Sequence, residues 1–189
     1  FNLDKSTSAA REPSFELKVP TKQEPCFDGL SKISDSMIIV KCVEEGELHL
    51  IDFVQVMQRR RSNQKLLTCE IRGAFRWQST EEIYINVSTR PNLNGILCGD
   101  NEGAIWLYDA REPVLNKKKF KAKPIKVLEW PECSVGGSGS KDEDKQLNES
   151  ISAGFKNPVV NATDMSSDGK YIVAVTDNNL VCIWKFSSS

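Results

Sequence analysis

The chain repeats one pattern of residues three times: a short apolar run, a polar turn and a second apolar run. The pattern is clearest in GILCGDNEGAIWLYD (Gly95 to Asp109) and in KYIVAVTDNNLVCIWKF (Lys170 to Phe186), and a further copy spans Ser36 to Phe53. The runs are rich in β-branched and aromatic residues, and the turns contain Gly, Asn or acidic residues, which adopt turn geometry readily. Each copy therefore predicts a β-hairpin.

Further strand-like runs flank each predicted hairpin. One precedes each hairpin, at 27–33, 82–88 and 159–165, and another follows the first two, at 65–71 and 124–130. A complete unit is thus a four-stranded antiparallel meander, and the third unit stops after its third strand. Repeated four-stranded units that end in a Trp-Asp-like pair are typical of the blades of a β-propeller.

The order of the units predicts an all-β fold, the C-terminal half of a seven-bladed WD-type β-propeller with about three blades plus a strand. We expect residues 1–20 to end a preceding blade, with a fourth strand at 13–19. The remaining parts are blades at 26–71 and 75–130, a flexible insertion at 131–157, and a last blade at 158–187 that lacks its fourth strand. Both terminal blades then expose unpaired surfaces. We therefore expect the missing N-terminal half of the propeller, from another chain or segment, to be a partner.

Composition and cysteine spacing narrow the class of protein. The net charge is −1, and no run approaches the roughly 18 apolar residues of a membrane span, so no membrane contact is expected. The six cysteines include no C-x-x-C pair, the spacing typical of zinc ribbons. Four of them lie within apolar runs: Cys42, Cys69, Cys98 and Cys182. We expect buried, reduced thiols in a cytosolic or nuclear compartment, and no metal or other cofactor.

Catalytic motifs are incomplete in this sequence. The single histidine, His49, lies in the middle of a predicted strand, where a packed or surface side chain is a simpler interpretation than a general base. The run Gly136 to Ser140 lacks the final Gly of a nucleophile elbow and has the composition of a linker, natural or engineered. The segment Asp164 to Val175 lacks the Glu that closes a calcium loop. The sequence therefore predicts that the protein is not an enzyme.

Two basic segments both follow a predicted third strand, in the connection to the fourth. One contains Arg59, Arg60 and Arg61, and the other contains Lys117, Lys118, Lys119 and Lys121. Equivalent loops project from the same rim of a propeller, so these residues are candidates for one positive surface that binds partners or DNA phosphates. The alternative is a pair of solvated loops whose charge is balanced by the acidic run at 141–144.

Two of the four tryptophans are further candidates for partner binding. Trp106 and Trp184 lie in predicted third strands, where inter-blade core is expected. Trp77 and Trp130 lie at strand ends beside polar residues, where an exposed ring can contribute to an aromatic cage for methyl-lysine. Core packing is the simpler interpretation for both of them.

The same motifs resemble those of a known family. The segments GILCGDNEGAIWLYD, IKVLEWPE and VVNATDMSSDGKYIVAVTDNNLVCIW resemble the C-terminal WD-repeat part of the leucine-rich repeat and WD repeat proteins that associate with the origin recognition complex. The resemblance covers roughly Phe27 to Trp184. It implies a nuclear, non-enzymatic scaffold for DNA replication and heterochromatin, with origin recognition complex subunits and methyl-lysine-marked histone tails as partners.

The chain departs from the common WD pattern in two respects. It has no Gly-His pair, and its units end in Ile51-Asp52, Tyr108-Asp109 and Trp184-Lys185. The usual Asp-His-Ser-Trp hydrogen-bond network is therefore not expected, and the rigidity of the blades should rest on apolar packing. Two other functions remain open: a WD-repeat scaffold or substrate receptor of another nuclear assembly, such as a ubiquitin ligase, and a nucleic-acid-binding propeller that uses its basic loops.

Overall fold

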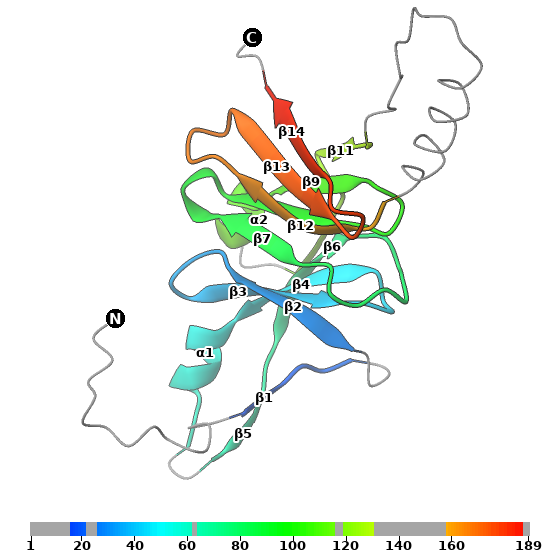
Figure 1. Ribbon diagram of the computed structural model, residues 1–189. Helices are drawn as coiled ribbons and strands as arrows, with labels where there is room; N and C mark the ends of the chain where they lie inside the picture. Colours follow the sequence, from blue (N-terminus) through cyan, green and yellow to red (C-terminus); the bar gives the residue numbers. More distant parts are fainter. Residues whose placement is uncertain (1–15, 22–25, 62–63, 116–118, 131–157, 187–189) are drawn as a thin grey trace, which may run out of the picture.

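Strands make up most of the regular secondary structure of the described residues, and they form three larger sheets and a two-stranded one. The computed structural model describes residues 16–21, 26–61, 64–115, 119–130 and 158–186. The three larger sheets stack in chain order, from blue and cyan through green to orange and red (Figure 1). The expected all-β class is confirmed. None of the helices in the described ranges has the length and apolar character that crossing a membrane requires.

The first sheet contains five strands in the order β10-β6-β4-β3-β2. Their bounds are β2 (Phe27–Lys32), β3 (Met37–Cys42), β4 (Glu47–Asp52), β6 (Ile71–Arg76) and β10 (Phe120–Ala122). The hairpin between β3 and β4 turns at Gly46, whose φ of 60° lies in the left-handed region that glycine adopts most readily. Strands β2, β3 and β4 agree with the sequence prediction.

The fourth strand expected at 65–71 was wrongly placed. Its residues form β5 (Leu66–Thr68), which pairs in parallel with β1 (Glu16–Lys18) in the two-stranded sheet, and β6 takes the place beside β4. The reason is burial, because β6 brings the fully buried Phe75 into the core between the first two sheets, whereas Leu67 packs on the opposite side of the first sheet. The described part of the strand expected at 13–19 contains β1, and the assignment of residues 1–20 to a preceding blade stays a prediction.

The second and third sheets follow the predicted meander closely. The second has the order β11-β9-β8-β7, with β7 (Val87–Arg90), β8 (Gly95–Gly99), β9 (Ile105–Asp109) and β11 (Lys126–Leu128). The third has the order β12-β13-β14, with β12 (Val160–Met165), β13 (Tyr171–Thr176) and β14 (Val181–Lys185). Strand β7 begins later than the predicted 82–88, because Tyr84 has a φ of 73° that interrupts an extended backbone. The expected insertion at 131–157 lies outside the described residues.

Short helices replace two of the expected loops. Helix α1 (Phe53–Gln58) follows β4, and the carboxylate of Asp52 accepts a hydrogen bond of 2.9 Å from the Gln55 backbone N–H at its N-terminus. Helix α2 (Arg111–Leu115) follows β9, where Asp109 accepts one of 2.8 Å from the Arg111 N–H. A short 3₁₀ helix, η1 (Pro91–Leu93), joins β7 to β8. Asp52 is therefore the N-cap of α1, and Asp109 accepts a hydrogen bond from the first residue of α2.

The connection between β9 and β11 contributes a strand to the neighbouring sheet. Strand β10 pairs in parallel with β6, and Phe120 lies opposite Gly73. The Phe120 ring occupies the space that a Cβ atom on Gly73 would need, 2.1 Å from its nearest ring atom, and packs edge-on against Phe75. A residue larger than glycine at position 73 would displace this ring. Strand β10 therefore ties the second unit to the first, which the sequence pattern did not predict.

The apolar core lies between the stacked sheets. One cluster joins the first and second sheets, and it includes Leu48, Phe75, Ile96, Cys98 and Tyr108. A second cluster joins the second and third sheets, and it includes Leu97, Ile105, Val160 and Ile172. Because Leu97 alternates with Ile96 and Cys98 along β8, the second sheet is covered on both faces. Trp106 and Trp184 pack against these clusters, as the inter-blade interpretation expected.

Polar side chains connect the first strands of successive sheets. The hydroxyls of Ser31 and Thr89 lie 2.8 Å apart between β2 and β7, and those of Ser88 and Thr163 lie 3.2 Å apart between β7 and β12. Arg90 also donates to the carboxylate of Asp164. These contacts fix the sheets against one another along one edge of the stack.

The face of the third sheet that points away from the stack is apolar. In the described part of the chain, Val181 and Ile183 of β14 are 65 and 62% exposed, and Tyr171 and Val175 of β13 are 40 and 39% exposed. Four large apolar side chains on one sheet face are unusual for a surface that contacts only water.

The turn between β8 and β9 contains a polar network that the sequence argument did not expect. The buried carboxylate of Asp100 accepts hydrogen bonds from the backbone N–H groups of Glu102 and Ala104 and, at 2.7 Å, from the indole Nε1 of Trp106. The expectation that blade rigidity rests on apolar packing alone was therefore wrong for this unit. One carboxylate can replace the histidine-containing network because it accepts several hydrogen bonds at once.

Asp100→Ala should lower the free energy of unfolding by about 2–3 kcal/mol, because it leaves the half-buried indole N–H of Trp106 and two backbone donors without their charged acceptor. Urea unfolding of both proteins measures the difference. Asp177, which follows β13 as Asp100 follows β8, is exposed and accepts one backbone hydrogen bond. Asp177→Ala should therefore cost at most about 1 kcal/mol, and an equal loss in the two variants would contradict the bracing role of Asp100.

Candidate partner-binding surface

One described cation from each basic segment lies beside the same carboxylate. Arg59, the residue after α1, places Nη1 3.8 Å from Glu70 Oε2, and Lys119, the residue before β10, places Nζ 3.6 Å from Glu70 Oε1. Segments separated by about 60 positions therefore meet on one side of the first sheet, because β10 pairs with β6 and carries Lys119 to that sheet. Two cations share one anion, and the exposed Arg61 adds to the positive charge. Lys117 and Lys118 lie outside the described residues.

Lys121 lies apart from that pair, on strand β10 itself. Its Nζ lies 2.6 Å from Glu47 Oε1, and this contact raises the pKa of the Lys121 ammonium. Exposed ion pairs of this kind contribute little to stability, so Lys121 is held in position without being removed from water. The predicted role of these cations in partner binding stays a prediction.

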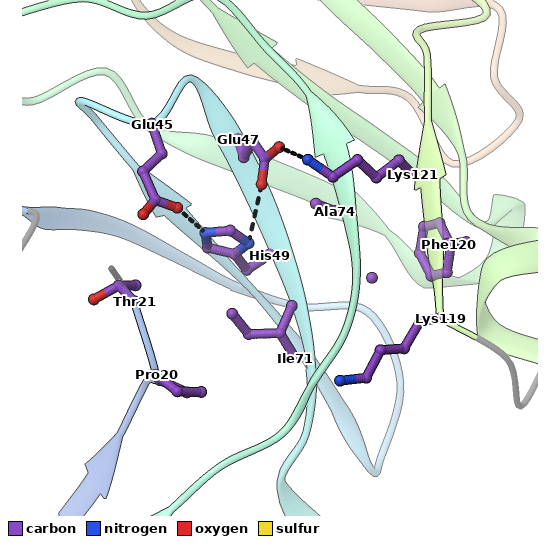
Figure 2. A pocket seen from close by; sticks show the side chains of 11 residues that line it. Pro20, Thr21, Glu45, Glu47, His49, Ile71, Ala74, Lys119, Phe120 and Lys121 are labelled. Carbon is purple, nitrogen blue, oxygen red and sulfur yellow. Dashed lines mark hydrogen bonds and ion pairs between the residues drawn. The ribbon is translucent and has the colours of Figure 1, made fainter. Parts of the chain in front are cut away.

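A cavity of about 740 Å³ lies beside Lys121. Figure 2 shows the residues that line it, which come from the segment after β1, the β3–β4 turn and strands β4, β6 and β10. Its charged lining consists of Glu45, Glu47, Lys119 and Lys121, and the His49 ring also lines it. Carboxylates and ammonium groups therefore line the same cavity, together with the apolar side chains of Ile71 and Phe120.

His49 lies at the base of this cavity. It is 2% exposed, and its Nε2 lies 3.2 Å from Glu45 Oε2 while its Nδ1 lies 3.9 Å from Glu47 Oε2. The ring also packs edge-on against Phe27, with centroids 6.3 Å apart. The histidine is packed within a strand of the first sheet, as the sequence interpretation had it.

Trp77 is a core residue and not an exposed aromatic. It is 3% exposed, its Nε1 donates a 2.9 Å hydrogen bond to the Gly99 carbonyl, and the Lys41 ammonium lies 5.0 Å from its ring centroid. The idea of an open ring at this position is corrected, because Lys41 already contacts it.

Trp130 is half-buried and packs edge-on against Trp184, with centroids 5.6 Å apart. It belongs with the second core cluster, whereas Trp77 belongs with the first. The tryptophan that shares a cavity with Trp77 is Trp106, which sequence reasoning had assigned to the core. That cavity has a volume of about 680 Å³ and is also lined by Glu45 and Glu47.

A buried ion pair supports the first two sheets from within. The Lys41 side chain has no exposed surface, and its Nζ lies 2.9 Å from Asp28 Oδ2, which also accepts a hydrogen bond from the Tyr84 backbone N–H. The pair holds the segment before β7 against the first sheet. The sequence feature that indicates a buried ion pair is Lys41, a lysine within the apolar run MIIVKC. The strand prediction did not consider it.

The described cysteines are free thiols, and three of them are buried as expected. Cys42, Cys69 and Cys98 are buried, Cys182 is half-buried and Cys26 is exposed. Burial raises the pKa of the Cys42 thiol to about 11 and also raises the pKa values of Cys69 and Cys98. These three thiols are therefore protonated at neutral pH.

Comparison with known proteins identifies the family. The model of the WD domain of leucine-rich repeat and WD repeat-containing protein 1 matches residues 20–187. The chain belongs to this family. The resemblance seen in the sequence motifs and the partial WD-type propeller are thereby confirmed.

Relatives of the same name occur in several vertebrates. The protein of Xenopus laevis is 30% identical over 184 residues, which cover 92% of this chain and 23% of the relative. The proteins of Danio rerio and Homo sapiens are both 29% identical, over 86 and 83% of this chain and 20 and 22% of the relatives. The chain thus spans less than a quarter of the length of these relatives. The family is a WD-repeat family of scaffold type, which suits a role in protein interactions.

Trp77→Ala should lower the free energy of unfolding by about 3–5 kcal/mol, because it removes a buried ring from the core between the first two sheets. Trp130→Ala should cost less, since Trp130 is only half-buried. Thermal and urea unfolding measure both changes. A Trp77→Ala protein as stable as the parent would contradict the core assignment.

Proposed function

We propose that the chain is part of a nuclear, non-enzymatic WD-repeat scaffold that binds origin recognition complex subunits and chromatin carrying repressive methyl-lysine marks. The observation that carries the proposal is membership of the leucine-rich repeat and WD repeat-containing protein 1 family over residues 20–187. The mechanism is rigid presentation. Stacked sheets hold the turns and connections at their ends in fixed positions, and partners bind across several of them.

The arrangement of the first two sheets supports this mechanism. Strand β10 belongs in sequence to the second unit but pairs with β6 of the first, and Lys121 on it contacts Glu47 near the β3–β4 turn. Surface groups from two units are therefore fixed relative to one another. A partner that binds this side contacts both units at once, which favours an intact propeller over separate blades.

The proposal includes a role for the exposed faces at the ends of the stack. The apolar side chains of β13 and β14, among them Val181 and Ile183, are suited to pack against another sheet as the second sheet packs against its neighbours. We propose that further blades of the propeller, from the rest of the polypeptide or from a second chain, cover this face. Propeller rings leave few open faces for the same reason.

The cavity lined by Trp77 and Trp106 supports the methyl-lysine part of the proposal. Aromatic rings attract quaternary ammonium groups, and the lining also includes the carboxylates of Glu45 and Glu47 beside the cations of Arg76, Lys121 and Lys123. Trp106 is the half-buried ring of the two, so it is the one available to a ligand.

A protein containing this chain should co-precipitate origin recognition complex subunits from purified components and should bind trimethyl-lysine histone-tail peptides more tightly than unmodified ones. Isothermal titration with the two peptides gives the ratio of affinities. Selective capture of another nuclear assembly, with no origin recognition subunits retained, would instead support the substrate-receptor alternative.

A second candidate function is binding of nucleic acid through the basic surface. The observation that favours it is the convergence of Arg59 and Lys119 on Glu70, which gathers positive charge from two connections. No aromatic ring lines the neighbouring pocket at Gln55 to Glu70, so contacts would be to phosphates and would depend on salt.

Replacing Arg59, Arg60 and Arg61 together by Glu should abolish DNA binding in that case and leave subunit binding intact, because phosphate contacts are electrostatic. The matched variant Glu70→Gln removes the shared carboxylate and should strengthen DNA binding. Fluorescence anisotropy over a range of salt concentrations measures both. If neither variant changes the affinity for DNA, the surface does not bind nucleic acid.

A further inference from the structure

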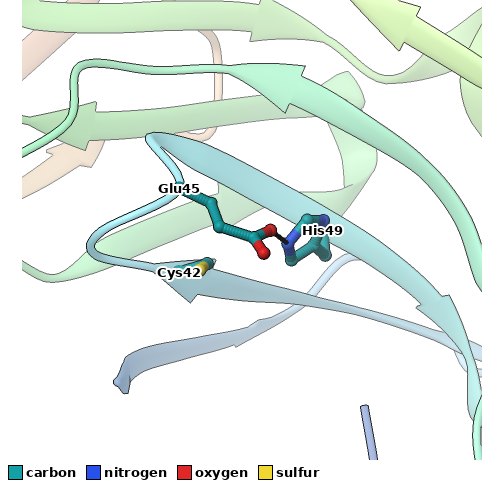
Figure 3. Close-up of side chains that lie close together, drawn as sticks. All are labelled: Cys42, Glu45 and His49. Carbon is teal, nitrogen blue, oxygen red and sulfur yellow. Dashed lines mark hydrogen bonds and ion pairs between the residues drawn. The ribbon is translucent and has the colours of Figure 1, made fainter. Parts of the chain in front are cut away.

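The hairpin between β3 and β4 gathers three side chains of the types that bind transition metals. The ligand atoms of Cys42, Glu45 and His49 all lie within 4.8 Å of one another. Figure 3 shows Cys42 on β3, His49 on β4 and Glu45 on the turn between them, with the Glu45 carboxylate directed at the His49 ring. We propose that this group is a binding site for one zinc ion.

The backbone register explains why these residues meet. In the β3–β4 ladder, Cys42 pairs with Glu47 and Val40 pairs with His49. Cys42 and His49 are therefore diagonal neighbours on the same face of the hairpin, a separation that side chains of this size can bridge. The turn, which depends on the positive φ of Gly46, then brings Glu45 over that face. The proximity of Cys42 and His49 is a consequence of the strand pairing, and the Glu45 side chain completes the group from the turn.

The group needs only a small adjustment to surround an ion. Zinc bonds of about 2.3 Å to sulfur and about 2.0–2.1 Å to nitrogen place neighbouring ligand atoms of a tetrahedral site roughly 3–4 Å apart. Cys42 and His49 are buried and held by the ladder, whereas the Glu45 side chain is 31% exposed on the turn. Glu45 is thus the side chain free to close around the ion.

The second nitrogen of His49 supplies an independent observation. His49 Nδ1 is buried and has no hydrogen-bond partner among the described residues, although Glu47 Oε2 lies 3.9 Å away. When a metal binds Nε2, the ring proton resides on Nδ1, and ligating histidines commonly donate that proton to a carboxylate. Glu47 is held in place for this role by Lys121, whose Nζ lies 2.6 Å from its other oxygen. With a metal on Nε2, the proton on Nδ1 would have Glu47 Oε2 as a nearby acceptor.

The donor set selects the metal. A thiolate and an imidazole are ligands for zinc and related transition metals, whereas magnesium and calcium prefer all-oxygen sites. The protein supplies three ligands, and Glu45 and His49 also line the cavity of about 740 Å³. The fourth position is therefore open to water or to a donor atom of a partner, as in zinc sites that are not purely structural.

Zinc binding to the full chain is measured by competition with a chromophoric chelator, and cobalt(II) replaces zinc as a spectroscopic probe. We expect one equivalent of zinc per chain and, with cobalt, a thiolate-to-metal charge-transfer band together with the visible bands of tetrahedral coordination. Cys42→Ser should abolish the charge-transfer band, and His49→Gln should lower the affinity at least tenfold. Cys98→Ser, which changes an equally buried thiol in the second sheet, is the matched control and should keep both signals.

Two further variants guard against loss of folding. Glu45 lies on the turn and Glu47 is the first residue of β4, directly after the turn, so Glu45→Gln and Glu47→Gln should leave the circular dichroism spectrum unchanged. Glu45→Gln should weaken zinc binding as a lost ligand, and Glu47→Gln should weaken it by about 10–100-fold through the lost support of His49. The proposal is overturned if the folded parent chain binds no zinc, if cobalt gives no charge-transfer band, or if zinc binding by the Glu45 variant equals that of the parent.

Discussion

Burial of both faces of the second sheet is the constraint on which the rest of the structure depends. Along β8, Ile96 and Cys98 enter the core shared with the first sheet, and Leu97 enters the core shared with the third. A single twisted sheet cannot bury two apolar faces by itself, so each unit requires a neighbour on either side. The stack follows from this requirement, and so do the exposed apolar residues of β13 and β14, where the described part of the chain supplies no further sheet.

Polar contacts then determine how the stacked sheets are aligned. The indole of Trp77 donates to Gly99, and the hydroxyl of Tyr108 donates to the Arg76 carbonyl at 2.6 Å, so the second sheet is registered on the first. The buried pair of Lys41 and Asp28 adds a charged contact in the same interface. Apolar packing tolerates small shifts, whereas directional hydrogen bonds and a buried ion pair do not. Surface groups from different units therefore keep fixed positions, which a scaffold requires.

Sequence reasoning succeeded where side chains alternate strictly and failed where pairing is decided at a distance. The hairpins at β3–β4, β8–β9 and β13–β14 could be predicted because two apolar runs and a turn lie next to one another in the chain. The fourth strand of the first unit could not, since residues 65–71 and 71–76 both have strand-like composition and only the core position of Phe75 separates them. Strand β10 was missed for a similar reason: its place depends on the space that Gly73 leaves for Phe120. A search for C-x-x-C pairs overlooked Cys42, Glu45 and His49, because their common face appears only once the hairpin register is known.

The sequence by itself determined the repeat, the all-β class, the family resemblance and the basic character of two connections, because these properties depend on residues close together in the chain. Tertiary structure alone decided that Trp77 is buried under Lys41, that Arg59 and Lys119 share Glu70, and that β10 leaves its own unit. These outcomes involve residues dozens of positions apart. Their contacts depend on which sheet faces pack together and on the space left between the packed side chains. The pattern of neighbouring residues in the chain contains neither kind of information.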